Sequence, residues 1–276
     1  MKPFTYHNHT VFCDGKSTVE EMVISAIAHG CDAIGFSAHS YTPFDSYYCM
    51  PVERIVEYRD SVRGCGEKYK DKINVYLGIE QDVESDAALY CDEYDYKIGS
   101  AHSIYKNGKF YSVDASEEQL LRMINELYGG DPYALCEDYF KELVKVCQIE
   151  DCQIVGHIDL ITKFNEGGKI FDEQNPRYVA AAERAIGALA QKGLIFEINT
   201  GAMSRGYRRS PYPAKHLLEI VKREGGRVTY SSDCHAAKNI LCGYEDACAL
   251  AKECGFEGFM KLTGSEWKLS YFDMER

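Results

Sequence analysis

The chain has 276 residues, and its 43 acidic side chains outnumber its 31 Lys and Arg side chains, which gives a formal net charge of −12 at pH 7. This acidity excludes broad, sequence-independent binding to long nucleic acid or to an anionic membrane, but a local group of cations could still hold a small anionic ligand. A chain of this length suits one α/β barrel, so we expect residues 1–276 to form a single domain.

The N-terminal stretch MKPFTYHNHT lacks the apolar core of a signal peptide, and no apolar run approaches the roughly 18 residues that a membrane span needs. Twelve cysteines are scattered along the chain and form no CxxC pair. We therefore expect a cytoplasmic protein whose cysteines are free thiols, and a structural zinc site built from them is the less favoured interpretation.

Short apolar runs alternate with amphipathic segments along the chain, which is typical of βα units around a largely parallel sheet. The expected strands are, in order, residues 4–10, 33–40, 73–83, 96–102, 154–159, 194–200 and 227–235. Seven strands predict an α/β fold, a distorted (β/α)7 TIM-like barrel. A doubly wound open sheet is the alternative.

Helices between these strands are marked by start and stop signals. STVE at 17–20 is a capping-box pattern; apolar residues at 19, 23, 26 and 27 then share one helical face, and Gly30 follows as a C-terminal stop. The segment 177–191 repeats this periodicity, and a further helix is expected over 133–147. Residues 105–128 are expected to be a partly helical excursion between two barrel units.

Potential metal ligands gather where these strands end. They are His7, His9, His39, Glu80, His102, His157, Asp233 and His235, with Asp14 in the turn after the first strand. Alternate residues of a strand point the same way, so the two pairs spaced two residues apart, at 7 and 9 and at 233 and 235, are the most specific signals. Any single histidine could instead be a satisfied core residue, but the joint pattern favours a metal centre on the C-terminal face of a barrel.

Nine nitrogen and oxygen ligands exceed what one ion needs, whereas three four-coordinate ions that share one carboxylate would use them. Mixed imidazole and carboxylate ligands suit divalent Zn, Fe or Mn better than Ca or Mg. The other two histidines are expected to be structural. His29 lies in the last turn of a helix, where the helix dipole favours a cation, and His216 lies within a helix. Cys13 is also left out of the expected chemistry.

The motifs HNH…D, SAHS, GIE, GSAHSI, GHID and SDCH resemble the polymerase and histidinol phosphatase superfamily. The phrases GHIDLITKFNEGG and EINTGAMSRGYRRSPYP resemble its stand-alone histidinol-phosphatase branch. The resemblance implies a distorted (β/α)7 barrel with a trinuclear metal centre. It implies one ion held by His7, His9, Glu80 and Asp233, a second that Glu80 bridges to His102 and His157, and a third held by Asp14, His39 and His235.

A cluster of divalent ions would supply hydroxide near neutral pH and neutralise charge on a phosphoryl group. The hypothesis is in-line attack by a metal-bridging hydroxide at Glu80 on a phosphomonoester. The proton for the leaving group could come from a metal-bound water, Asp14 or His235. Candidates for substrate binding are Lys163, Arg205 and Arg208, with Asn199 either positioning substrate or satisfying buried backbone groups. Arg208 and its neighbour Arg209 could equally be solvated loop residues.

The expected partner is a small phosphorylated substrate, most specifically L-histidinol phosphate of histidine biosynthesis. Another phosphoesterase of the same superfamily, acting on nucleotides, oligonucleotides or phosphotyrosyl protein, is the alternative. A non-catalytic metal-binding protein with a decayed site is disfavoured, because all nine ligand positions are intact. Oligomeric state is not predicted.

Overall fold

Seven parallel strands form the centre of the molecule in the order β1-β2-β3-β4-β7-β8-β9. The computed structural model describes residues 1–90 and 93–272. The strands are β1 Phe4–Thr5, β2 Ala33–His39, β3 Asn74–Asp82, β4 Tyr96–Ser100, β7 Ile154–Val155, β8 Ile195–Asn199 and β9 Arg227–Ser231. Every pairing along this order is parallel.

The two ends of the sheet meet, so the sheet is a nearly closed barrel. Just beyond β1 and β9, Asn8 and Cys234 form a parallel bridge, and His9 N donates to Cys234 O at 2.8 Å. The side chains of Thr5 and Ser232 lie 3.0 Å apart across the same seam. The distorted (β/α)7 barrel is therefore confirmed, and the doubly wound open sheet is wrong.

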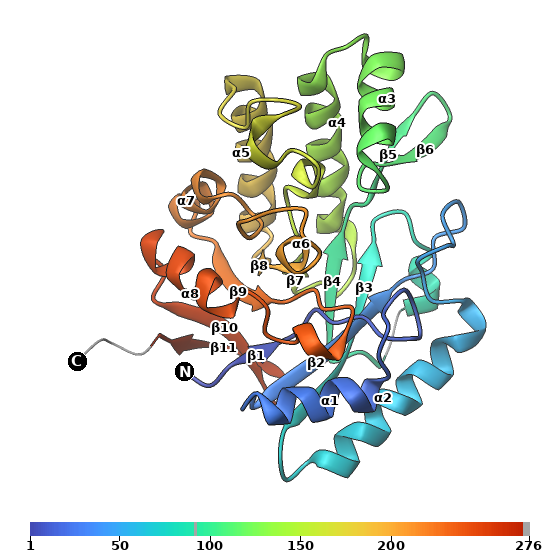
Figure 1. Cartoon of the computed structure of the whole chain (residues 1–276), viewed down its shortest axis with the longest axis vertical. Coiled ribbons are helices and arrows are strands. Elements are labelled where there is room, and N and C mark those ends of the chain that lie inside the picture. The colour runs from blue at the N-terminus through green and yellow to red at the C-terminus, as the bar shows by residue number, and fades with distance from the viewer. Residues whose placement is uncertain (91–92, 273–276) are drawn as a thin grey trace.

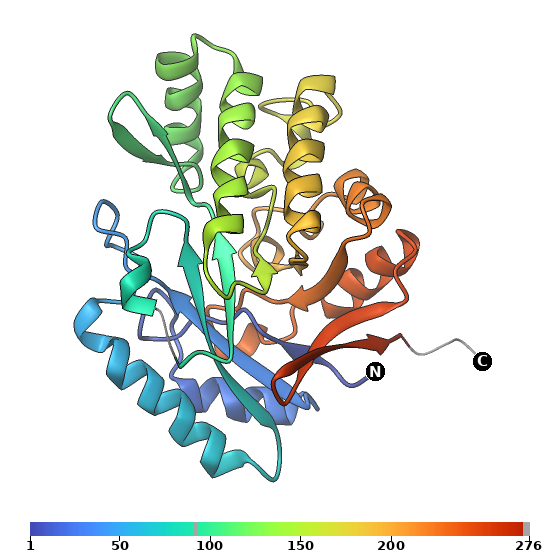
Figure 2. The ribbon, with the colours of Figure 1, turned by 180° about the vertical axis from the view of Figure 1, so that it is seen from behind.

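Most helices pack around the outside of the barrel (Figures 1 and 2). They are α1 Val19–Ala28, α2 Ile55–Tyr69, α3 Glu117–Tyr128, α4 Pro132–Val144, α5 Pro176–Gln191, α6 Gly201–Ser204, α7 Lys215–Arg223 and α8 Tyr244–Glu253. Short 3₁₀ helices lie at Val52–Arg54, Ala87–Tyr90, Lys145–Gln148, Leu160–Thr162, Glu166–Gly168 and Ala237–Asn239. In Figure 1, α1 and α2 lie below the sheet, whereas α3, α4 and α5 stand side by side above it.

The helices expected from the sequence bury the faces that were expected, but the capping box of α1 begins one residue later than expected. In α5 the buried side chains include Tyr178, Ala182, Ala185, Ile186 and Leu189. At α1 the capping box is made by Thr18 and Glu21 and not by residues 17 and 20. The side chain of Ser17 instead accepts a hydrogen bond from Ala237 N at 3.1 Å, so it joins α1 to the loop after β9. Gly30 ends the helix with φ +73°, as expected.

Two hairpins were not predicted. The first, β5 Ser103–Lys106 with β6 Lys109–Ser112, precedes α3 in the excursion between β4 and β7. Its turn is Asn107–Gly108, and both residues have positive φ, as a two-residue hairpin loop requires. The second, β10 Gly258–Thr263 with β11 Glu266–Tyr271, covers the N-terminal end of the barrel (Figure 2). Trp267 of β11 packs its ring 5.2 Å from that of Tyr6.

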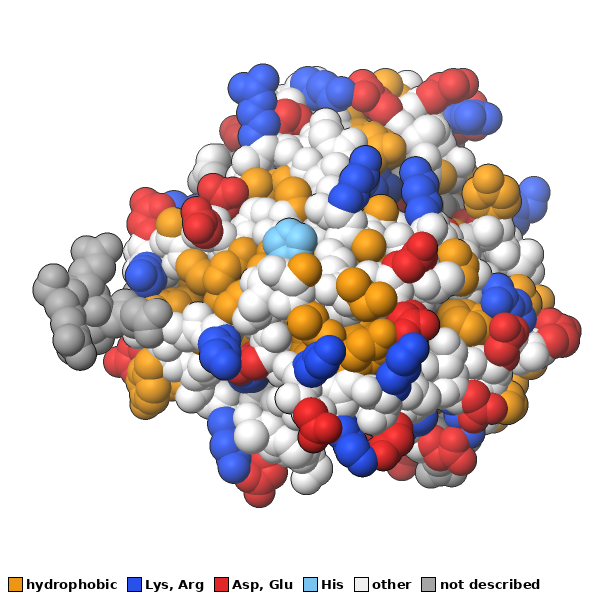
Figure 3. Space-filling model, turned by 60° about the horizontal axis from the view of Figure 1, so that its bottom comes forward, with side chains coloured by type: hydrophobic (Ala, Val, Ile, Leu, Met, Phe, Trp, Pro, Cys, Tyr) orange, Lys and Arg blue, Asp and Glu red, His pale blue; other side chains and the backbone are white. Residues whose placement is uncertain are grey.

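The surface carries charges of both signs. On the face shown in Figure 3, Lys and Arg side chains are separated by acidic and apolar ones, with no continuous basic area. No helix within the described ranges is long and apolar enough to span a bilayer. The described cysteines are all free, and Cys91 lies outside the described residues.

Candidate metal centre and pocket

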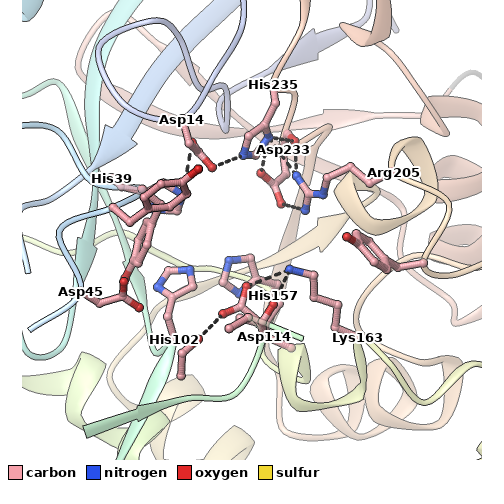
Figure 4. Close-up of a pocket in the computed structure, with 16 residues that line it drawn as sticks. Asp14, His39, Asp45, His102, Asp114, His157, Lys163, Arg205, Asp233 and His235 are labelled. Atoms are coloured by element: carbon pink, nitrogen blue, oxygen red, sulfur yellow. Dashed lines mark hydrogen bonds and ion pairs between the residues drawn. The ribbon is translucent and has the colours of Figure 1, made fainter. Parts of the chain in front are cut away.

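The C-terminal ends of the barrel strands bring all nine expected ligand residues together. Those that line the pocket are Asp14, His39, His102, His157, Asp233 and His235 (Figure 4). Glu80 lies within β3 and His39 ends β2, whereas the other seven lie in the loops that follow the strands. Strands β1, β4, β7 and β9 are shorter than expected. After Thr5 the chain leaves the β ladder, because Asn8 Nδ2 donates to Gly35 O of β2 at 2.7 Å.

Glu80 is at the centre of the cluster and is 1 % exposed. Its Oε2 lies 2.7 Å from His39 Nδ1 and 3.2 Å from His7 Nε2. Its Oε1 lies 3.1 Å from His157 Nε2 and 3.3 Å from His102 Nε2. One buried carboxylate thus faces imidazoles from four different strand ends, which is the arrangement expected of a carboxylate that bridges two ions.

The remaining ligand candidates form the side of the cluster nearer the surface. Asp233 Oδ1 lies 3.3 Å from His9 Nε2 and 3.6 Å from His235 Nδ1. Asp14 Oδ2 lies 3.1 Å from His235 Nε2, and Asp14 Oδ1 lies 3.8 Å from His39 Nε2. Asp14 and His235 are partly exposed and line the pocket, so this part of the cluster is accessible to a ligand.

The donor set fits bound cations. The nine residues form four overlapping groups, and within each group the ligand atoms all lie within 4.8 Å of one another. The groups are His9, Asp14, His39 and His235; His7, His9 and Asp233; His7, Glu80 and His157; and His39, Glu80 and His102. Moreover, His7 Nε2, His9 Nε2 and Glu80 Oε2 are buried and make no hydrogen bond within the described part of the chain. Buried polar atoms normally have partners, and a divalent ion would satisfy these three.

The neighbouring histidines His7 and His9 have pKa values that are shifted in opposite directions. Burial, together with the nearby imidazoles of His39 and His235, lowers the pKa of His9 to about 3, so His9 is neutral as a metal ligand must be. Burial alone would also lower the pKa of His7, but the carboxylates of Glu197 and Glu80 outweigh it and raise that pKa well above its usual range. Metal binding at His7 must therefore displace a proton.

The carboxylates of the cluster stay ionised. Burial would raise the pKa of Glu80, yet the surrounding imidazoles, His39 first, hold it well below its usual range. Burial would likewise raise the pKa of Asp233, but the guanidinium of Arg205 together with the imidazoles of His7, His9 and His235 holds it well below its usual range. Cys13 behaves differently, because burial and the charge of Asp14 raise its thiol pKa to about 12. Its Sγ lies 3.4 Å from His9 Nδ1, but a neutral thiol is a poor ligand and nucleophile.

Two carboxylates that were not predicted orient the histidines from behind. Glu197 of β8 is fully buried and accepts hydrogen bonds from His7 Nδ1 at 2.7 Å and from His157 N at 3.0 Å. Asp82 of β3 accepts from His102 Nδ1 at 3.0 Å. Such partners fix the tautomer, so that Nε2 of His7 and of His102 faces the cluster. The spacing could have revealed Asp82, which lies two residues after Glu80 on the same strand.

A pocket of about 330 Å³ opens over the cluster, and both expected phosphate-binding cations line it. In Figure 4, Lys163 and Arg205 extend into it from one side, and Asp45 lies on the opposite side. Lys163 Nζ donates to Asp114 Oδ2 at 3.0 Å, and Arg205 Nη2 donates to Asp233 Oδ2 at 3.0 Å.

Two residues expected to bind substrate lie outside the pocket lining. Asn199 is fully buried; its Nδ2 donates to Glu197, and its Oδ1 accepts from Gly201 N. It therefore satisfies buried groups, which was the other interpretation of this residue. Arg208 is buried against Glu173 and does not face the pocket.

Arg209 and the two histidines that were expected to be structural lie away from the cluster. Arg209 is exposed, His29 Nδ1 lies 2.8 Å from Ser25 O at the end of α1, and His216 contacts Gln174 on the surface. No group of ligand atoms within the described ranges includes either histidine.

Comparison with known proteins agrees with this geometry. The model of the PHP domain family matches residues 5–201, which is more than half of the chain. The chain belongs to the PHP domain family. The match starts at β1 and ends just after β8, so it includes seven of the nine ligand candidates, and Asp233 and His235 follow it.

Similarity to curated proteins extends over nearly the whole chain. A protein of Schizosaccharomyces pombe named "Probable histidinol-phosphatase" is 27 % identical, with 92 % of this chain and 87 % of the relative covered. The histidinol-phosphatase of Lactococcus lactis is 26 % identical, with 96 % of each chain covered. A crystal structure of histidinol phosphate phosphatase from L. lactis, in complex with zinc, L-histidinol and phosphate, has a TM-score of 0.72 at 24 % identity. It covers 97 % of this chain and 99 % of its own.

Proposed function

We propose that this PHP domain protein is a metal-dependent phosphomonoesterase that hydrolyses L-histidinol phosphate to L-histidinol and phosphate. The observation that carries the proposal is a buried cluster of imidazoles and carboxylates beneath a pocket that Lys163 and Arg205 line. The relatives that cover most of the chain are named histidinol-phosphatases, which supports this substrate among phosphomonoesters. We further propose that the whole chain acts as one domain in the cytoplasm.

The cluster would hold three divalent ions, of Zn, Fe or Mn. One would be held by His7, His9, Glu80 and Asp233, a second by Glu80, His102 and His157, and a third by Asp14, His39 and His235. When bound, such ions lower the pKa of a coordinated water and neutralise charge on the phosphoryl group.

The chain's own pocket residues divide the remaining tasks. Lys163 and Arg205 bind the phosphoryl oxygens, and the planar guanidinium suits a bidentate contact. Each already has a carboxylate partner, so substrate phosphate competes with Asp114 for Lys163 and with Asp233 for Arg205. At the rim, His235 Nε2 and Asp14 Oδ2 lie 3.1 Å apart and would orient a water molecule that gives its proton to the departing alkoxide.

The leaving group proposed for this substrate carries an amine, and the pocket offers it a carboxylate. Asp45 lines the pocket opposite Lys163 and Arg205, and within the described residues its side chain makes no hydrogen bond or ion pair (Figure 4). Burial and the charge of Asp114 raise the Asp45 pKa, which indicates a site that is short of positive charge. A substrate with phosphate at one end and a cation at the other therefore matches the pocket.

One observation favours a larger substrate as the second candidate. A further cavity of about 530 Å³ adjoins the pocket and shares Asp45, Ser112 and Ala115 with it. Its wall includes the rings of Phe44 and Phe110, stacked with centroids 4.0 Å apart, which could receive a base or an aromatic side chain. A nucleotide or a phosphotyrosyl peptide would need this space.

Phosphate release separates the two candidates. Metal-loaded protein is assayed with L-histidinol phosphate, AMP, a phosphotyrosyl peptide, p-nitrophenyl phosphate and its bis-ester. We expect the highest kcat/KM for L-histidinol phosphate. A preference for AMP, the peptide or the diester would replace the proposed substrate, and no turnover of any ester by fully metallated protein would contradict phosphoesterase activity.

A further inference from the structure

Arg208 belongs to the same loop as Arg205. Its side chain lies behind the pocket and reaches the loop that carries Lys163. Its side chain is 6 % exposed. Its Nη1 donates to the backbone oxygen of Thr162 at 2.9 Å and to Glu173 Oε1 at 3.1 Å. Thr162 directly precedes Lys163, and Arg208 follows Arg205 by three residues. One guanidinium thus joins the backbone beside one pocket cation to the loop of the other.

The carboxylate partner of this guanidinium is itself held in place. Glu173 Oε1 also accepts from Asn165 Nδ2 at 3.0 Å. The Asn165 side chain is fully buried, and its Oδ1 accepts from the backbone N of Ile170 and of Phe171 at 2.9 and 3.0 Å. The loop after Lys163 is therefore folded around Asn165 and presents Glu173 to Arg208 in a fixed position.

An aromatic contact joins the same two loops closer to the pocket. The rings of Phe164 and Tyr207 meet edge to face with centroids 5.5 Å apart. Lys163 Nζ lies 5.1 Å from the centroid of the Tyr207 ring, so a residue of the Arg205 loop forms part of the surroundings of Lys163. The loops that carry Lys163 and Arg205 are therefore joined by several non-covalent contacts, and the buried guanidinium of Arg208 makes the charged one.

We propose that Arg208 is a positioning residue that fixes the separation of Lys163 and Arg205, and thereby the affinity of the pocket for a phosphoryl group. The inference rests on the proposed function only in taking these two cations as the phosphate-binding groups. A guanidinium can bond a carbonyl and a carboxylate at once in one plane, which a lysine ammonium cannot reproduce with the same geometry. A shift of about 1 Å in a binding group can cost on the order of 100-fold in kcat/KM, and here the loss is expected in KM because both cations bind the phosphoryl group.

The test measures kinetics and product inhibition of the metal-loaded Arg208→Met variant. We expect the KM for the phosphomonoester and the inhibition constant of inorganic phosphate to rise together by about 10-fold, with kcat changed less than about 3-fold and metal content unchanged. Arg208→Lys should recover part of the phosphate affinity. Arg209→Met is the matched control, because Arg209 is the exposed neighbour, and it should leave all these values unchanged.

A double-mutant cycle distinguishes positioning from mere support of the fold. If Arg208 acts through Lys163, then Arg208→Met should add less than about 2-fold to the KM of Lys163→Met. An equal rise in both backgrounds would overturn the proposal, as would a lower melting temperature of Arg208→Met with wild-type KM and phosphate inhibition. Should that variant not fold, Glu173→Gln serves in its place, since it keeps the packing and weakens the guanidinium's partner.

The outcome is separable from that of the proposed function. Phosphate binding can be measured by calorimetry on the metal-loaded protein without any turnover. A wild-type protein that hydrolyses no monoester, but whose phosphate affinity falls in Arg208→Met, would reject the proposed function and keep the positioning role. If the wild type is active and Arg208→Met has an unchanged phosphate affinity, the proposed function is kept and the positioning role of Arg208 is rejected.

Discussion

Glu197 offers the sharpest test of the metal centre, because it touches no proposed ion and yet holds two of the proposed ligands. Its carboxylate accepts three hydrogen bonds, from His7 Nδ1 at 2.7 Å, His157 N at 3.0 Å and Asn199 Nδ2 at 2.8 Å. The change Glu197→Gln keeps size and shape but replaces one acceptor oxygen by a donor NH2 group. All three partners are donors, so neither orientation of the amide satisfies them.

The two orientations fail in different ways. If the amide oxygen faces His7, the NH2 group meets the N–H groups of His157 and Asn199, and two buried hydrogen bonds of about 1 kcal/mol each are lost. If the NH2 group faces His7, Nδ1 must accept, and the ring proton moves to Nε2, the nitrogen that faces Glu80. Either way, removal of such a partner typically costs 10- to 100-fold in metal affinity, or about 1.4 to 2.8 kcal/mol.

The assay titrates metal-free protein with Zn²⁺ in a chelator-buffered solution and follows both bound metal and phosphate release. We expect the titration midpoint of Glu197→Gln to move to 10- to 100-fold higher free metal, with activity recovered in part at saturation. Glu57→Gln on the exposed face of α2 is the control and should titrate like the wild type. Wild-type metal affinity together with wild-type kcat/KM in Glu197→Gln would refute the reasoning.

Three further changes test the cluster, the pocket and the buried charge beside it. His9→Ala should lose bound metal and activity together, while His29→Ala should lose neither; full metal content in His9→Ala would show that the ligand assignment is wrong. Asp45→Asn should raise the KM for L-histidinol phosphate about 10-fold and leave p-nitrophenyl phosphate, which has no cation, unaffected; equal effects on both esters would remove Asp45 from recognition. Burial raises the pKa of Asp159 to about 6, so the folded state favours its protonated form and this carboxyl lowers stability progressively from pH 4 to pH 6. Asp159→Asn should therefore raise the free energy of unfolding by up to about 3 kcal/mol at pH 7.5 and by little at pH 4, as measured in urea; an equal effect at both pH values would contradict this.

The barrel was predictable because its signals are local. Strands β2, β3 and β8 match the expected apolar runs to within one residue at each end, and each ends in a polar residue. Strand β9 begins where expected but ends four residues early, and α5 follows an unbroken helical period. The boundaries of β1 were not predictable. The side chain of Asn8 takes the carbonyl of Gly35, a bond between segments far apart in the sequence, and it ends the ladder early. The turn Asn107–Gly108 is a strong local signal for a hairpin, but it lies within the segment 105–128, for which only a partly helical excursion is expected.

In the site, too, the features set by local sequence signals were predictable, and those set by contacts between distant segments were not. Ligand candidates were predictable, because parallel strands bring their C-terminal ends to one face whatever the loops do. The role of Arg208 was not, because its neighbours Thr162 and Glu173 come from another loop, and a basic residue in a polar stretch looks the same whether it faces the pocket or the protein interior. The role of Glu197 was also not predictable. A carboxylate inside an apolar strand must have a partner, but that partner is His7, which lies 190 residues earlier in the sequence.

Charge in the pocket implies an order of binding. Five carboxylates, Asp14, Asp45, Glu80, Asp114 and Asp233, line or underlie it, against the two permanent cations Lys163 and Arg205. Both cations are already paired, and the pKa values of Asp14, Glu80 and Asp233 are all lowered, so these groups are ionised near neutral pH. In metal-free protein, His7 and His102 add two positive charges because neighbouring carboxylates raise their pKa values, but Glu197 and Asp82, which accept hydrogen bonds from these two rings, add two negative charges. The local charge is therefore (2 + 2) − (5 + 2) = −3, which repels a phosphate dianion. Metal must therefore bind before substrate, and metal-free protein should bind inorganic phosphate at least 10-fold more weakly than metal-loaded protein in calorimetry. Equal affinities would mean that Lys163 and Arg205 alone recognise the anion, and the cluster would then serve only the chemical step.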